Sequence, residues 1–267
     1  MKEKTMTDNP FYNQISRKTI VTGHYGSGKT EFSVSLAMLL ASQQDKSVLP
    51  GSATQENGSR VREHQNRPHV LPYTNTAIID LDIANPYFRS RERRELLENA
   101  GIAVYGSAFD VEITAELPAL GARLRTPLED ASCQVIIDTG GNDTGALVLN
   151  QFTKYFKDDE TTVLAVINAN RPDTSNIDSA IEHIEAIEKI TGLTVSAIVN
   201  NTNLLRETTA DDILYGNEFC KKICKMTGKS LLCNCYPEEL VDPGELAGLN
   251  GNLMPMGLYM RPTWLDK

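Results

Sequence analysis

The stretch from Gly23 to Thr30, GHYGSGKT, decides how this sequence is interpreted. Two glycines separated by four residues and followed by Lys and Thr form the pattern of a phosphate-binding loop. Glycines let successive backbone N–H groups turn toward a phosphate, and a helix that opens at Lys29 adds the positive end of its dipole. The Lys29 ammonium can reach phosphate oxygens, and the Thr30 hydroxyl can complete the coordination of Mg²⁺.

The residues around this loop favour a binding site over a glycine-rich turn that only caps a helix. A β-branched run, Thr19 to Thr22, precedes the loop, and apolar residues at helical spacing follow it, from Phe32 to Leu40. This order of strand, loop and helix is the context that a phosphate-binding loop requires. We therefore expect a nucleotide to be bound by Gly23, His24, Tyr25, Gly26, Ser27, Gly28, Lys29, Thr30 and Glu31.

Two later strands end in acidic residues. The run AIIDLD carries Asp80 and Asp82, which the two-residue period of a strand places on the same side. The run VIID ends at Asp138 and continues into Thr-Gly-Gly, which ends at Gly141 and provides a flexible backbone to sense the terminal phosphate. Taken singly, each aspartate would be interpreted as a strand-end turn acid. With the loop, we expect metal binding by Thr30, Asp80, Asp82 and Asp138, and catalysis by Lys29, Asp82 and Asp138.

The remaining chain alternates apolar strands with amphipathic helices. Such alternation is typical of a parallel sheet that is covered on both faces. We expect an α/β fold of the P-loop NTPase type, a three-layer αβα sandwich with a doubly wound, mostly parallel sheet. The expected strands are 19–22, 77–81, 134–138, 163–168, 195–200 and 230–234, and the expected helices beyond the first are 89–99, 175–190 and 211–226.

The composition along the chain divides it into three parts. Residues 1–18 are polar and aperiodic and are expected to form a flexible tail. Residues 19–240 are expected to form one nucleotide-binding domain, interrupted at 43–76 by a polar insertion with few apolar anchors, for which disorder is the simplest interpretation. Residues 241–267 are expected to be an extension that packs back on the domain.

Charge and hydropathy exclude several classes of partner. The formal net charge of −9 disfavours binding to nucleic acid, which proteins bind mainly through positive surface charge. No stretch is long and apolar enough to span a membrane, and the first residues lack the apolar core of a signal peptide, so a cytoplasmic location is expected.

The cysteines allow two interpretations. Cys220 with Cys224, and Cys233 with Cys235, form two close pairs that could hold a metal ion or an iron–sulfur cluster. Ordinary burial is the simpler interpretation, because the first pair lies one turn apart on an expected helix and the second shares one face of an expected strand.

Together, GHYGSGKTE, IIDLD followed by NPYFRSRE, and VIIDTGG resemble the MinD/ParA/CobQ-type group of P-loop ATPases. The resemblance spans most of residues 19–240. It implies that Asp82 lies near the hydrolytic water and Asp138 near Mg²⁺. It also implies that the purine is read by Asn200 or Asn201 and by backbone near Pro237.

The sequence departs from this group at one position. Many members carry a second lysine directly after the first glycine of the loop, which reaches the nucleotide of a partner subunit in a sandwich dimer, whereas this chain has His24. A neutral imidazole does not supply the same permanent charge, so that dimer mechanism is in doubt. The chain also lacks an Asn-Lys-x-Asp element, which Asn170 to Asp173 only approaches, and adenine is therefore expected over guanine.

These observations lead to one main functional expectation and two alternatives. The main one is a slow, Mg²⁺-dependent ATPase that switches a protein partner, with a homodimer as a further option. In that scheme Arg89 or Arg91, after the first acidic strand, contacts phosphate or the partner, although a solvated helix face with local ion pairs is the simpler interpretation. The alternatives are an ATP-dependent biosynthetic enzyme of the CobQ or dethiobiotin synthetase type, and a metal or cofactor chaperone.

Overall fold

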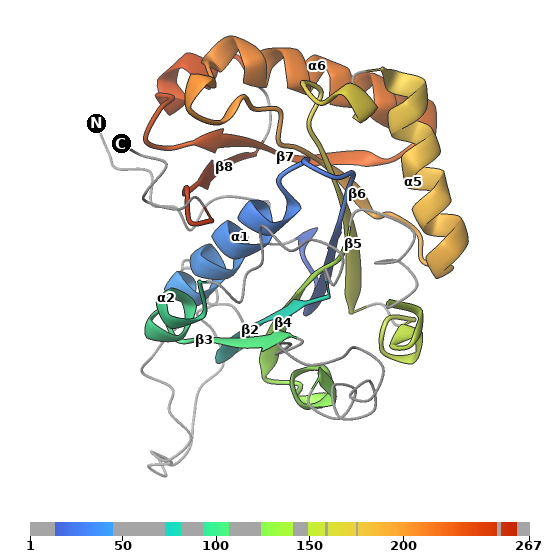
Figure 1. Ribbon diagram of the computed structural model, residues 1–267, viewed down its shortest axis with the longest axis vertical. Helices are drawn as coiled ribbons and strands as arrows, with labels where there is room; N and C mark the ends of the chain where they lie inside the picture. Colours follow the sequence, from blue (N-terminus) through green and yellow to red (C-terminus); the bar gives the residue numbers. More distant parts are fainter. Residues whose placement is uncertain are drawn as a thin grey trace, which may run out of the picture.

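The computed structural model describes residues 14–44, 73–81, 93–106, 124–140, 149–157, 160–174, 176–249 and 252–260. Within them one sheet has the strand order β3-β2-β4-β1-β5-β6-β7-β8, and every neighbouring pair is parallel (Figure 1). The strands are β1 (Lys18–Thr22), β2 (Asn75–Asp80), β3 (Ile102–Gly106), β4 (Cys133–Asp138), β5 (Thr161–Ile167), β6 (Ala197–Asn200), β7 (Ser230–Pro237) and β8 (Leu253–Met256).

Helices cover both faces of this sheet. The helices α1 (Lys29–Gln43) and α2 (Arg94–Asn99) pack on one face, and α5 (Ile177–Thr191) and α6 (Ala210–Thr227) pack on the other (Figure 1). The central strands are buried along almost their whole length, which explains why they read as continuous apolar runs. The expected doubly wound α/β sandwich is confirmed.

Helix α1 lies against the middle of the sheet and is buried on most of its circumference. Phe32, Leu36 and Leu40 are fully buried, and so are small residues on the other sides, such as Ser33. A helix buried on more than one side shows little amphipathic contrast. The loop that precedes α1 is therefore anchored to the core on both sides, by β1 and by this helix.

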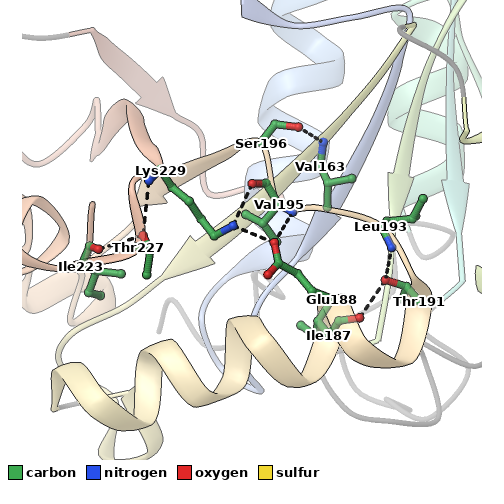
Figure 2. Close-up of polar contacts among 10 residues, drawn as sticks. All are labelled: Val163, Ile187, Glu188, Thr191, Leu193, Val195, Ser196, Ile223, Thr227 and Lys229. Atoms are coloured by element: carbon green, nitrogen blue, oxygen red, sulfur yellow. Dashed lines mark hydrogen bonds and ion pairs between the residues drawn. The ribbon is translucent and has the colours of Figure 1, made fainter. Parts of the chain in front are cut away.

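A polar cluster lies at the amino-terminal ends of strands β6 and β7 (Figure 2). Glu188 of α5 accepts hydrogen bonds from the Val195 amide and the Lys229 ammonium, both at 2.7 Å. The same ammonium donates to the Val195 carbonyl at 3.2 Å. Because the Lys229 side chain is 12% exposed, this ion pair is shielded from solvent and ties α5 to the strand starts.

Two strands were not expected from the sequence. β3 lies at one edge of the sheet and β8 at the other, and Pro255 is tolerated in β8 because of this edge position. β8 pairs with β7, so this part of the expected 241–267 extension is a strand of the domain itself. Of the expected helix at 89–99, residues 94–99 are helical, while 89–92 lie outside the described residues.

The domain also begins earlier than expected. β1 starts at Lys18, and Arg17 is 6% exposed. The Arg17 guanidinium donates to the carbonyls of Leu128 and Asp130 and pairs with Glu160 at 3.1 Å. A buried guanidinium needs such partners, so the boundary of the expected tail at residue 18 is wrong. Residues 1–13, and 45–72 of the expected insertion, lie outside the described residues.

None of the helices in the described ranges is long and apolar enough to cross a bilayer.

Candidate phosphate-binding site

The loop between β1 and α1 has a backbone that only glycine fits at its two ends. Gly23 has φ of 152° and Gly28 has φ of 82°. A Cβ at Gly23 would overlap the Val166 carbonyl oxygen, and a Cβ at Gly28 would overlap Nδ2 of Asn201. The glycine spacing seen in the sequence is therefore required both by the turn and by the close approach of β5 and of the segment after β6.

No side chain among the described residues caps the N-terminus of α1. Its N-cap is Gly28, whereas the two other long helices are capped by side chains. The Asn176 side chain accepts from the Ser179 amide at the start of α5, and Asp212 accepts from the Thr209 amide at the start of α6. The first N–H groups of a helix lack intrahelical partners, so the open end of α1 suits an anion.

The cation and hydroxyls of the loop lie at this open end. Lys29 and Thr30, in the first turn of α1, are 5% and 7% exposed. Lys29 Nζ lies 3.4 Å from the His24 carbonyl oxygen, so its side chain folds back along the loop. The Ser27 hydroxyl is buried and has no hydrogen-bond partner among the described residues. Orphaned polar groups around a cation are the chemistry that a phosphate would satisfy.

Two carboxylates lie at the carboxyl edge of the sheet on the side of α1. Asp80 ends β2 and Asp138 ends β4, directly opposite each other in register. Their side chains point to the same face as Ile78 and Ile136, which pack with α1. Both aspartates are at least nine-tenths buried. Carboxylate oxygens are hard donors of the kind that Mg²⁺ prefers. The expected Asp82 and Gly141 lie outside the described residues.

The segment after β6 supports the loop from the other side. Asn201 Nδ2 donates to the Ser27 carbonyl at 2.8 Å, and Asn203 Nδ2 donates to the Asn201 carbonyl at 2.7 Å. Asn200 is fully buried, and its side-chain Nδ2 donates to the carbonyl of Ile213 and to Oδ1 of Asn234. Both asparagines proposed to read the purine therefore have amide donors engaged within the protein.

Two other expected binding residues, Pro237 and Glu31, accept hydrogen bonds from amides in the C-terminal part of the chain. Pro237 ends β7, and its carbonyl accepts from the amides of Leu240 and Val241. The Glu31 carboxylate accepts from the amides of Tyr259 at 2.6 Å and Met260 at 3.1 Å. Burial raises the pKa of Glu31 to about 7 despite these hydrogen bonds. Glu31 thus joins α1 to the segment that follows β8.

His24 and Tyr25 follow the first glycine of the loop. The His24 ring packs edge-on against His183 of α5, with 5.0 Å between ring centroids, and the Tyr25 side chain is 60% exposed. Sequence reasoning missed Arg171, whose Nε donates to the Gly26 carbonyl at 3.0 Å. Its only sequence signal is its position just beyond the carboxyl end of β5.

The cysteines pack in the core. Cys220, Cys233 and Cys235 are buried, and burial raises the pKa of the Cys220 and Cys235 thiols. Metals bind thiolates, so a raised thiol pKa opposes metal binding. Among the described residues no group of three or more His, Cys, Asp or Glu side chains is placed to hold a metal ion.

Comparison with known proteins gives similarity of fold. No protein family profile and no curated protein matches the chain. Among solved structures, the chain is similar to a nucleotide-binding protein from Archaeoglobus fulgidus in complex with ADP, with 12% identity, a TM-score of 0.41, and coverage of 85% of this chain and 86% of that one. It is also similar to chloroplast FtsY from Physcomitrella patens, with 14% identity, a TM-score of 0.48 and coverage of 85% and 60%.

A third similar structure is the signal recognition particle 54 kDa protein from Aeropyrum pernix in complex with GDP, with 18% identity, a TM-score of 0.44, and coverage of 80% of this chain and 40% of that one. The chain thus spans less than two thirds of the length of these last two proteins. At these identities the similarities concern the arrangement of strands and helices and assign no activity.

Proposed function

We propose that this chain binds ATP with Mg²⁺ at the loop from Gly23 to Thr30, hydrolyses it slowly, and acts as a nucleotide-dependent switch for a protein partner. The observation that carries the proposal is the uncapped, glycine-shaped start of α1 opposite the paired strand ends of Asp80 and Asp138. Each feature has a simpler explanation alone. Their occurrence at one edge of one sheet favours a nucleotide site.

The residues of the site divide the chemistry between them. The backbone amides at the start of α1 and the Lys29 ammonium would hold the phosphate chain. Thr30, Asp80 and Asp138 would hold Mg²⁺, which neutralises charge on the phosphates when bound. Asp82 remains our candidate for orienting the attacking water.

The proposed switch is the chain that follows each carboxylate. Asp138 is followed by Thr139, whose amide and hydroxyl both bind the Val21 carbonyl, at 3.1 and 2.9 Å. This fixes the start of the segment that leads to Gly141 next to β1. A terminal phosphate that contacts Gly141 would therefore order the chain after Thr139, whose own position is already fixed. Phosphate-dependent switches order their segments in this way.

Adenine is proposed over guanine because the chain lacks an Asn-Lys-x-Asp element. The similar structures bound to ADP and to GDP leave both bases to be tested.

The test is phosphate release from ATP and from GTP, with and without Mg²⁺, by the wild type, Lys29→Ala and the control Lys225→Ala on α6. We expect slow release from ATP that requires Mg²⁺, is lost in Lys29→Ala and is retained in the control. Equal release by Lys29→Ala would contradict the proposal, and a preference for GTP would correct the base. Rapid release that depends on a small-molecule acceptor would replace the switch by a biosynthetic enzyme.

A further inference from the structure

We propose that Arg171 supplies the second positive charge of the phosphate site from within the same chain, in contact with the bound phosphate chain. This inference rests on the proposed function, because it assumes that the loop binds a polyphosphate. It assigns to the connection after β5 a role in distinguishing ATP from ADP and AMP.

The first argument is the contact between Arg171 and the loop. The guanidinium donates from Nε to the Gly26 carbonyl at 3.0 Å. A Cβ on Gly26 would lie 3.1 Å from Nε and 3.4 Å from Cζ, so the guanidinium lies next to the position that a side chain at Gly26 would take. Gly26 has φ of 76°, which further favours glycine. The middle of the phosphate loop is therefore shaped to receive this cation.

The second argument is that the backbone carrying Arg171 is held rigidly. Asn168 is fully buried, and its carbonyl accepts from the Arg171 amide at 3.1 Å and from the Thr174 hydroxyl at 2.7 Å. The side-chain amide of Asn168 donates from Nδ2 to the Asn203 carbonyl at 3.2 Å, which ties the connection to the segment after β6. The ring of Pro172 fixes its own φ, and Pro172 also restricts the backbone of Arg171, the residue before it. The backbone of Arg171 is therefore fixed, and its exposed side chain is held by the hydrogen bond to Gly26.

The third argument is charge. Lys29 is the single cation between Gly23 and Thr30, and His24 occupies the position after the first glycine. Asp80 and Asp138 add negative charge at the same edge of the sheet, and the whole chain carries a net charge of −9. A triphosphate needs further compensation. Among the described residues the side chain of Arg171 uses only Nε, which leaves both terminal NH₂ groups to bind phosphate oxygens in a forked geometry.

A purely structural role for Arg171 is the alternative. In that case the guanidinium would only hold the Gly26 carbonyl, and its loss would weaken every ligand of the loop equally. If Arg171 contacts the phosphate chain, its loss should instead weaken the affinity for each nucleotide in proportion to the charge of that nucleotide's phosphates. A lysine in its place should then restore part of the lost affinity.

The test is calorimetric titration of ATP, ADP and AMP with Mg²⁺ into the wild type, Arg171→Gln, Arg171→Lys, and the control Arg125→Gln at an exposed position of the helical segment 124–129. We expect Arg171→Gln to weaken ATP binding about tenfold or more, ADP binding less, and AMP binding little. Arg171→Lys should recover part of the preference for ATP, and the control should match the wild type.

Equal weakening of all three ligands, or unchanged binding of ATP by Arg171→Gln, would overturn the inference while leaving the proposed function intact. If the wild type binds none of the three nucleotides, the proposed function itself fails and the inference with it. Circular dichroism and thermal unfolding of each variant identify a loss of binding that is due to misfolding. If Arg171→Gln misfolds, Arg171→Lys alone decides: a preference for ATP retained in part or in full supports the inference, and its complete loss opposes it.

Discussion

The Asn201 carboxamide donates a hydrogen bond from Nδ2 to the Ser27 carbonyl at 2.8 Å, across 174 positions of sequence. The same Nδ2 occupies the space where a Cβ on Gly28 would lie. The end of β6 therefore sets the position of the phosphate loop just before α1 begins. Because both residues are buried, this contact holds the loop in a low-dielectric setting where a lost hydrogen bond is costly.

Replacing Asn201 by Ala should destabilise the protein by about 1–3 kcal/mol, since it leaves the buried Ser27 carbonyl without its partner. Asn150→Ala is the matched control, because Asn150 also donates one hydrogen bond to a carbonyl, that of Ile190, but in an exposed setting. Denaturant unfolding of both variants measures the difference. An Asn201→Ala variant no less stable than the control would show that the contact does not hold the loop.

Replacing Gly28 by Ala should abolish nucleotide binding and cost more stability than the same change at Gly192. Both glycines have positive φ, 82° and 66°, so each substitution incurs backbone strain of about 1–2 kcal/mol. Only at Gly28 does the new methyl group meet another residue, Asn201, while nothing lies within 4 Å of a Cβ at Gly192. Thermal unfolding compares the two variants, and equal stabilities would contradict the packing described for the loop.

Replacing Asp138 by Asn should remove the dependence of ATP binding on Mg²⁺ and leave the fold in place. The amide keeps the shape of the fully buried side chain but lacks the charge that a divalent ion requires. Titration of ATP with and without Mg²⁺ into Asp138→Asn and into Asp211→Asn, an exposed control on α6, checks this. A full Mg²⁺ effect in Asp138→Asn would place the metal elsewhere.

Glu31 should make stability fall as pH rises. Its pKa is raised from 4.5 to about 7 by burial, so the folded protein binds this proton more tightly than the unfolded chain does. The stabilisation from the bound proton is complete below about pH 4.5 and is lost as pH rises through 7. The loss amounts to about 3 kcal/mol.

Denaturant unfolding of the wild type and of Glu31→Gln at pH 5, 6, 7 and 8 measures this term. The free energy of unfolding of the wild type should decline relative to that of Glu31→Gln across the series. Glu182→Gln, an exposed control on α5, should follow the wild type. A constant difference between the wild type and Glu31→Gln would show that Glu31 does not titrate in this range.

The sequence predicted those features that depend on residues close together in the chain. The glycine spacing from Gly23 to Gly28 indicated the turn, and the strand-end position of Asp138 indicated the edge at which it lies. The central strands were recognisable because they are buried on both faces. β8 was missed because four residues with Pro255 among them give no periodic signal, and its pairing with β7 is visible only in three dimensions.

Contacts between distant segments could not be predicted in this way. The resemblance implied that Asn200 or Asn201 reads the purine, and it gave no sign that the Asn201 side chain donates to the Ser27 carbonyl, because no local pattern relates these two residues. Glu31 was expected among the nucleotide-binding residues, and no sequence signal indicated its hydrogen bonds to amides more than two hundred residues away. Arg171 was missed for the same reason, since its contact with Gly26 depends on β5 lying beside β1.

The central claim is that the start of α1 encloses a triphosphate, and direct titration of ATP with Mg²⁺ tests it. Calorimetry on the wild type, Lys29→Ala and the control Lys225→Ala should show saturable one-site binding in the wild type and control, and at least a tenfold weaker affinity in Lys29→Ala. Absence of binding by the folded wild type, or equal affinity in Lys29→Ala, would contradict the account.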